Sequence, residues 1–111
     1  MHLTSYLQNG VLTIVLTGEI DHHSAKQYIQ SITSKIEAYK PQICVLDYKD
    51  VSFMDSSGIG VIIGRYKKIS GEGGSVSVVN VNDRVKKIFN LSGMNKIINI
   101  YDTYEEVASS L

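Results

Sequence analysis

The sequence has no surplus of either charge, because 11 Lys and Arg residues balance 11 Asp and Glu residues. Neutralising a nucleic-acid backbone requires an excess of cationic side chains, so a direct nucleic-acid partner is not expected. No apolar run approaches the roughly 20 residues that span a bilayer. The start of the chain, MHLTSYLQNG, lacks the basic and long apolar segments of a signal peptide. The composition therefore predicts a cytoplasmic protein with no membrane partner.

Cysteine and proline are equally scarce, with one residue of each. A lone cysteine cannot form an internal disulfide, and Cys44 lies in the apolar run ICVL, where a buried and inert thiol is the simplest interpretation. No linker, repeat or low-complexity tract divides the chain. A hydrophobic fraction of 43% can fill one compact core, so residues 1–111 are expected to form one domain. A monomer is the expected state.

The first half of the sequence alternates between strand-like and helix-like segments. Asn9-Gly10 separates two β-type runs, which is typical of a type I′ hairpin turn. From Asp21 to about Tyr39, apolar residues recur every three or four positions and predict a helix that Pro41 closes. The apolar run 43–48 then predicts a buried central strand that leads through KDVSF, as a loop, to the next helix.

The second half repeats this alternation. Asp55 or Ser56 is a competent N-cap for a helix that continues to about residue 69. The strand SVSVVN follows, then a short helix with Gly93 as its C-cap, a strand near 97–101, and a terminal helix with the capping-box pattern of Thr103 and Glu106.

The predicted order is β-β-α-β-α-β-α-β-α. It indicates an α/β fold with a mixed, mostly parallel sheet flanked by about four helices, in which the hairpin supplies the antiparallel pair. In such sheets the functional surface tends to lie at the carboxyl ends of the strands. The candidate loops are therefore GEIDHHS and VSFMDSSG.

Three glycines interrupt the helix predicted for FMDSSGIGVIIGRYKKI. Each costs about 1 kcal/mol relative to alanine in a helix interior. For Gly60 and Gly64 we expect close packing against the sheet or a neighbouring helix. For Gly58 we expect that the missing side chain keeps the helix entrance open to a macromolecular partner.

Motifs of nucleophilic and nucleotide chemistry do not fit this segment. Neither Ser56 nor Ser57 has the preceding glycine of a G-x-S-x-G nucleophile elbow. Gly64 is followed by Arg65 rather than by the lysine of a P-loop. No catalytic residue is predicted.

Metal chemistry is also poorly supported. His22 and His23 would project about 100° apart on a helix, so we expect surface or capping roles rather than a metal site. Asp21, Asp47 and Asp55 could gather into the acidic pocket of a receiver-like enzyme. That alternative lacks a lysine at a matching strand end.

Ser56 has a further possible role as a modified residue. A phosphate at the mouth of a helix would meet free amide N–H groups and the positive end of the helix dipole. It would also add about −1.5 to −2 charge beside Asp55, which would repel an acidic or closely packed partner while the domain stays folded. This chemistry suggests a switch of binding. The alternative is that Ser56 and Ser57 merely cap the helix.

Three segments, LTGEIDHHSA, FMDSSGIGVIIGRYKKI and VKKIFNLSGMNKII, carry a resemblance to a known family. Along essentially the whole chain they resemble the bacterial anti-sigma factor antagonists of the STAS domain family, in particular antagonists of the sporulation anti-sigma F factor. The resemblance implies an α/β regulatory domain that needs no cofactor and catalyses nothing itself. It also implies that the first serine of D-S-S-G, Ser56 here, is phosphorylated by the anti-sigma factor, which is a serine kinase.

The resemblance further implies a partner-switching cycle. The unphosphorylated form binds the anti-sigma factor kinase and frees the sigma factor, phosphorylation ends that binding, and a PP2C-type phosphatase restores it. The partner-binding residues implied here are Asp21, His22, Asp55, Ser57, Gly58 and Ile59. The alternatives are a STAS module of another stress or scaffold system and a small receiver-like or nucleotide-hydrolysing enzyme.

Overall fold

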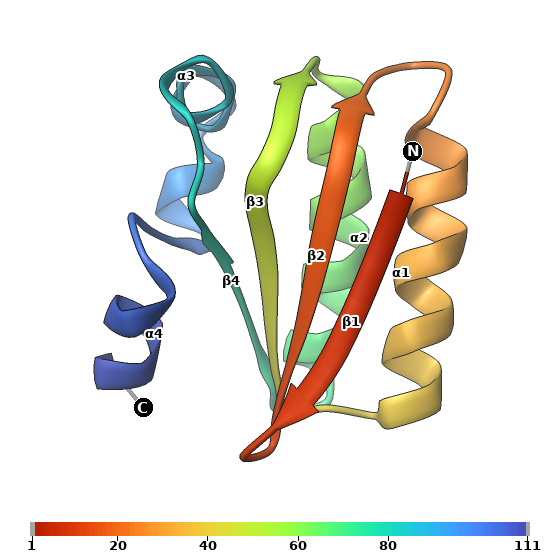
Figure 1. Cartoon of the computed structure of the whole chain (residues 1–111), viewed down its shortest axis with the longest axis vertical. Helices are drawn as coiled ribbons and strands as arrows, with labels where there is room; N and C mark the ends of the chain where they lie inside the picture. Colours follow the sequence, from red (N-terminus) through yellow and green to blue (C-terminus); the bar gives the residue numbers. More distant parts are fainter. Residues whose placement is uncertain (1, 111) are drawn as a thin grey trace.

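The computed structural model describes residues 2–110 and contains one five-stranded sheet in the order β1-β2-β3-β4-β5 (Figure 1). β1 pairs with β2 in antiparallel fashion, and the other neighbouring strands pair in parallel. The strands are β1 (His2–Gln8), β2 (Val11–Ile20), β3 (Ile43–Met54), β4 (Ser75–Val79) and β5 (Asn99–Tyr101). The predicted mixed, mostly parallel sheet is thereby confirmed.

The helices cover the two faces of the sheet unequally. They are α1 (Ala25–Tyr39), α2 (Ser57–Gly71), α3 (Asp83–Ser92), the short 3-10 helix η1 (Met94–Lys96) and α4 (Tyr104–Ser110). Figure 1 shows α1 and α2 side by side on one face. Val107 of α4 packs on the other face, against Val11, Val45 and Val79. No helix within the described residues is long and apolar enough to cross a bilayer.

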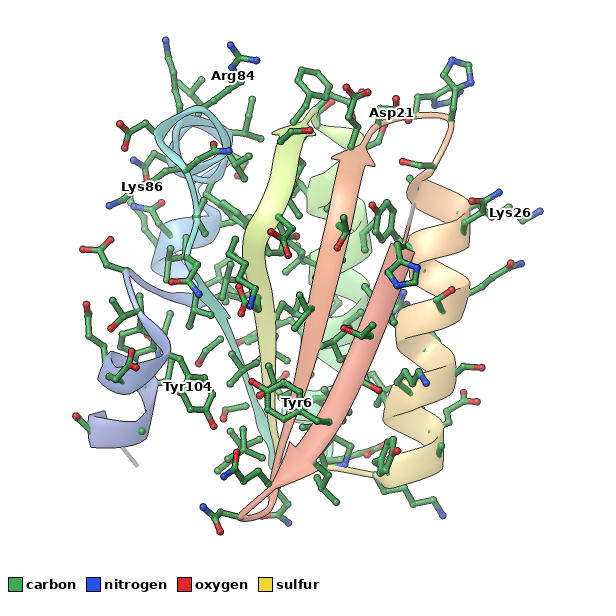
Figure 2. The ribbon with its side chains drawn as sticks, in the orientation of Figure 1. Tyr6, Asp21, Lys26, Arg84, Lys86 and Tyr104 are labelled. Atoms are coloured by element: carbon green, nitrogen blue, oxygen red, sulfur yellow. The ribbon has the colours of Figure 1, made fainter. Side chains whose placement is uncertain are left out.

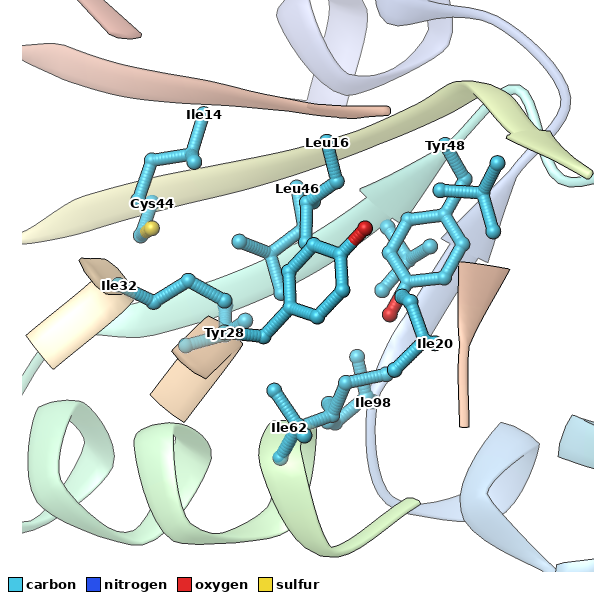
Figure 3. Close-up of a cluster of buried hydrophobic side chains, with 14 of the residues drawn as sticks. Ile14, Leu16, Ile20, Tyr28, Ile32, Cys44, Leu46, Tyr48, Ile62 and Ile98 are labelled. Carbon is cyan, nitrogen blue, oxygen red and sulfur yellow. The ribbon is translucent and has the colours of Figure 1, made fainter. Parts of the chain in front are cut away.

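The main core lies between the sheet and the helices α1, α2 and α3 (Figure 3). The hydroxyl of Tyr28 on α1 donates to the carbonyl of Thr17 on β2 at 2.7 Å, which joins helix and sheet. The rings of Tyr48 on β3 and Phe89 on α3 meet edge to face, with centroids 5.8 Å apart. Cys44 is buried as predicted, and burial raises the pKa of its thiol to about 12, so the thiol stays protonated.

Several local predictions hold. The φ angles of Asn9 and Gly10 are 53° and 78°, both positive as a type I′ turn requires. Gly93 adopts the left-handed conformation expected of a C-cap, with φ 80°. The last strand begins two residues later than predicted, because the amides of Ile97 and Ile98 donate to the Met94 carbonyl in η1.

The central strand β3 is much longer than predicted. It continues through KDVSF to Met54, whereas these polar residues suggested a loop. The register with β2 shifts twice, between Val15 and Thr17 and between Gly18 and Glu19, as at β-bulges. The bulges leave Lys49 and Asp50 exposed while the strand keeps its pairing. Bulges disrupt the regular alternation of polar and apolar residues, and this alternation is the signal by which a strand is predicted from sequence.

Candidate functional site

The two candidate loops meet at one end of the sheet. Ile20, the last residue of β2, pairs with Met54, the last residue of β3. Asp21 and Asp55 are the next residues, and the amide of Asp55 donates to the carbonyl of Ile20 at 3.1 Å. Figure 2 shows Asp21 at the tip of β2, at the end of the molecule where β3 also ends. The two loops predicted at the carboxyl ends of the strands therefore lie next to each other, and a hydrogen bond joins them.

The first loop is a closed capping arrangement at the start of α1. The Asp21 carboxylate accepts from the amides of His23 at 3.0 Å and Ser24 at 2.9 Å. The Ser24 hydroxyl accepts in return from the Asp21 amide at 3.0 Å and donates to the Glu19 carbonyl at 2.7 Å. The helix therefore begins after the turn, at Ala25, and not at Asp21 as predicted. The Ser24 amide, by donating to Asp21, lowers the pKa of that carboxyl.

The second loop also begins with an aspartate that accepts from backbone amides, but here the serine that follows makes no capping hydrogen bond. The Asp55 carboxylate accepts from the Ser57 amide at 2.8 Å, and the Asp55 carbonyl accepts from the Gly58 amide at 3.0 Å. Ser56 has helical backbone angles, φ −63° and ψ −19°, and its side chain makes no capping hydrogen bond. Of the two predicted caps, the structure selects Asp55. Ser56 is exposed directly before α2, at the N-cap position, and its hydroxyl is not used to cap the helix.

The amides at the entrance of α2 are already occupied. Those of Ser57 and Gly58 donate to Asp55, and that of Ile59 donates to the Ser56 carbonyl at 3.2 Å. The expectation that a phosphate would meet free amides here is therefore wrong for these three groups. The physical reason is that Asp55 accepts from two of these amides and the Ser56 carbonyl accepts from the third, so the donors that a phosphate would need are used within the turn.

Close packing in α2 occurs at Gly58 and not at Gly60 or Gly64. A Cβ at Gly60 or Gly64 would meet nothing within 4 Å, so the close packing expected for these two residues is wrong. Gly58 is buried instead, and a Cβ there would lie 2.5 Å from Sδ of Met54 and 3.2 Å from Cγ2 of Ile20. Gly58 thus lets the first turn of α2 pack against the ends of β2 and β3. Its contact with a partner remains a prediction.

Asp47 does not join the other two aspartates. It lies within β3, paired with Val15 and Val79, and is only 6% exposed. Its carboxylate accepts from the Lys49 amide at 2.9 Å and from Nδ2 of Asn80 at 3.1 Å. Because β3 continues past Asp47 before the site begins, the acidic pocket of a receiver-like enzyme does not form from these residues.

The remaining predicted residues lie at the rim of the same end. His22 and His23 are exposed, and their rings meet edge to face with centroids 5.7 Å apart. Ile59 is partly buried against the core. Within residues 2–110, no group of three or more His, Cys, Asp or Glu side chains could hold a metal ion.

The contribution of Ser24 to the site was not predicted from the sequence. Asp21 and Asp55 each stand three residues before a small residue, in the frames D-H-H-S and D-S-S-G. The spacing matches that of a capping box, in which the third helical residue bonds back to the cap. Comparison of the two frames could have identified both caps and the outward position shared by His22 and Ser56.

Comparison with known proteins gives consistent matches. The chain matches the STAS domain family over residues 2–107. It is 43% identical to the anti-sigma F factor antagonist of Paenibacillus polymyxa, over 84% of this chain and 80% of that one. It is 34% identical to the anti-sigma-B factor antagonist of Bacillus subtilis (strain 168), over 80% of each. It also resembles the solved structure of the Bacillus cell fate determinant SpoIIAA in the phosphorylated form, with a TM-score of 0.72, 26% identity, and coverage of 98% of each chain.

Proposed function

The chain belongs to the STAS domain family, among relatives that are anti-sigma factor antagonists, and on this premise we propose that Ser56 is the phosphate-accepting switch of an anti-anti-sigma factor. In its unphosphorylated form the protein binds an anti-sigma factor serine kinase and frees the sigma factor. Phosphorylation of Ser56 ends this binding, and a PP2C-type phosphatase restores it. The protein acts as a cytoplasmic monomer without a cofactor of its own.

The observation that carries the proposal is the free hydroxyl of Ser56. Ser56 is exposed and has no capping bond, because Asp55 caps α2 in its place. In the neighbouring loop, by contrast, two hydrogen bonds hold the Ser24 hydroxyl. A residue that accepts a phosphoryl group must be reachable and must not be needed to hold the fold. Ser56 meets both requirements.

The occupied amides explain how a phosphate would act. A phosphate on Ser56 would find the amides of Ser57, Gly58 and Ile59 already bonded, so these amides would not bind it. It would remain in solvent beside the Asp55 carboxylate and add about −1.5 to −2 charge to the surface. A partner that fits the unphosphorylated surface would then be repelled. The proposed binding surface comprises Asp21, His22, Asp55, Ser57, Gly58 and Ile59.

We expect the intact chain to gain one phosphate when it is incubated with ATP and its anti-sigma factor kinase. Intact mass spectrometry should show that Ser56→Ala gains none and that the matched variant Ser57→Ala still gains one. A phosphate that persists in Ser56→Ala would move the modified residue elsewhere. Fragment spectra would then identify it.

Binding provides the second test of the switch. Ser56→Ala should bind the kinase as tightly as the unphosphorylated protein, whereas Ser56→Asp should bind at least about tenfold more weakly because of the added charge. Calorimetric titration measures both values of Kd. Equal affinities for the two variants would contradict a charge-operated switch.

A second candidate follows from the similarity to the anti-sigma-B factor antagonist of Bacillus subtilis. The higher identity to the anti-sigma F factor antagonist favours sporulation as the controlled process. Pull-down from the native cell, followed by identification of the bound anti-sigma factor, distinguishes the two.

The purified protein alone should hydrolyse neither ATP nor GTP above background, and turnover lost in Ser56→Ala would instead favour an enzyme.

A further inference from the structure

We propose that Asp55 is a positioning residue that prevents the Ser56 hydroxyl from capping α2 and so keeps it available to the phosphoryl donor. The inference rests on the proposed function, since it concerns how Ser56 accepts phosphate. In that reaction Oγ of Ser56 forms a bond to the γ-phosphorus of ATP held by the kinase. The bond from this phosphorus to the bridging oxygen breaks, ADP leaves, and the hydroxyl proton passes to a base in the kinase active site.

A regular N-cap elsewhere in the same molecule shows what Ser56 would otherwise do. Asn82, before α3, has an extended backbone with φ −72° and ψ 167°, and its side chain accepts from the Val85 amide at 2.8 Å. Serine is about as strongly preferred as asparagine at this position. Ser56 directly precedes the hydrogen-bonded residues of α2, yet it has helical backbone angles and no capping bond.

The hydrogen bonds of Asp55 account for this difference. Its carboxylate holds the Ser57 amide and its carbonyl holds the Gly58 amide, so the helical conformation already begins at Ser56. A cap side chain normally binds the amide two or three residues after it, from a residue with non-helical backbone angles. Ser56 has helical angles, and its side chain makes no such bond. The Ser56 hydroxyl therefore stays outside the helix entrance.

Removing the Asp55 carboxylate should reverse the arrangement. The Ser57 amide loses its acceptor, and Ser56 becomes the residue best suited to cap the helix. We expect its backbone to become extended and its hydroxyl to accept from the amide of Gly58 or Ile59. The hydroxyl would move inward and its lone pair would be engaged, which should slow phosphoryl transfer, because a misplacement of about 1 Å can cost a factor of about 100.

A different role for Asp55 would depend on its charge, as a proton acceptor or as a contact for a cation of the kinase. Asparagine separates the two possibilities because it caps helices about as well as aspartate but carries no charge. Asn82→Ala is the matched control. It removes the cap of α3, with its bonds to Val85 and Val51, and leaves the Asp55 cap in place.

The kinetic test uses the intact chain, ATP and the cognate anti-sigma factor kinase. We expect kcat to fall roughly 10- to 100-fold in Asp55→Ala. Asp55→Asn should keep a clearly higher kcat than Asp55→Ala because asparagine retains the cap, while its KM should rise because Asp55 also belongs to the proposed binding surface. Asn82→Ala, which lies outside that surface, should stay within about threefold of the wild type. A KM that changes less than kcat would show that the partner still binds but the hydroxyl is misplaced. Asp55→Asn as slow as Asp55→Ala, or Asp55→Ala as fast as the wild type, would overturn the proposal.

A second measurement needs no kinase. The ¹³Cα and ¹³Cβ chemical shifts of Ser56 should indicate a helical backbone in the wild type and in Asp55→Asn, and an extended backbone in Asp55→Ala. Helical shifts in all three proteins would refute the positioning role. If the wild type accepts no phosphate, the proposed function fails, and these shifts still decide whether Asp55 positions Ser56.

Discussion

The two loops that form the site begin alike and end differently. Each follows the last residue of a parallel strand, and each starts with an aspartate whose carboxylate accepts from backbone amides two or three residues later, at the entrance of the next helix. The difference lies three residues later. In the first loop the Ser24 hydroxyl accepts from the Asp21 amide, whereas in the second the equivalent residue is Gly58, and the Asp55 amide donates to the carbonyl of Ile20, the last residue of β2.

This difference separates a loop whose serine hydroxyl is hydrogen-bonded from a loop whose exposed serine makes no capping bond. Ser24 is used entirely within its own loop, through the Asp21 amide and the Glu19 carbonyl. Ser56 lies one residue after the capping aspartate, where the first loop has His22, and both of these side chains are exposed. The chemistry of serine is therefore the same in both loops, but its position relative to the cap decides whether the hydroxyl is available.

The largest effect is expected when the second loop receives a side chain at Gly58, the position equivalent to Ser24. Gly58→Ala should destabilise the protein by about 1–3 kcal/mol, because its Cβ would collide with the buried Met54 side chain. The matched variant Gly60→Ala faces open space and should stabilise it by up to about 1 kcal/mol. Urea unfolding measures both. Equal effects would show that the two glycines are not packed differently.

Removing the hydroxyl of Ser24 and that of Ser56 should change the free energy of unfolding by different amounts. Ser24→Ala loses two hydrogen bonds and leaves the Asp21 amide without its acceptor, so the free energy of unfolding should fall by about 1–2 kcal/mol. Ser56→Ala loses no capping bond and should change it by no more than about 0.5 kcal/mol. A large loss in Ser56→Ala would mean that this hydroxyl has a structural role after all.

The smallest expected effect is the pH dependence that Asp21 contributes. The pKa of its carboxyl is lowered in the folded state, and the largest cause is the hydrogen bond from the Ser24 amide. The ionised form is thus favoured by folding, and its contribution is present above the unfolded pKa and is lost as pH falls through the folded value. Unfolding midpoints between about pH 3 and 6 should vary less in Asp21→Asn than in the wild type. Identical profiles would rule out this contribution.

The sequence predicted the order of elements correctly because their periodicity, turns and caps are local signals. The hairpin at Asn9-Gly10 and the C-cap at Gly93 depend only on backbone conformations that their own residues favour. The extension of β3 could not be predicted this way, since its polar residues are held in the sheet by pairing with β2. The meeting of the two candidate loops followed from the strand order, and that conclusion did not depend on the boundaries of β3.

The details of the site depended on three-dimensional packing. Helical periodicity alone could not show which glycine of α2 faces the strand ends, and so Gly60 and Gly64 were assigned a role that belongs to Gly58. The choice between Asp55 and Ser56 as the cap was likewise open, because both residue types cap helices well. Only the backbone angles of Ser56 and the bond from the Ser57 amide decide it.

The bulges in β3 set the length of the strand as well as its shape. Between the pairs Val15–Asp47 and Ile20–Met54, β3 contains two more residues than β2. Deleting one of these residues would draw Asp55 back by one residue, about 3.3 Å, and would turn the following side chains to the opposite face of the sheet. The position of the Ser56 hydroxyl relative to the sheet therefore depends on two bulges that lie several residues earlier in β3.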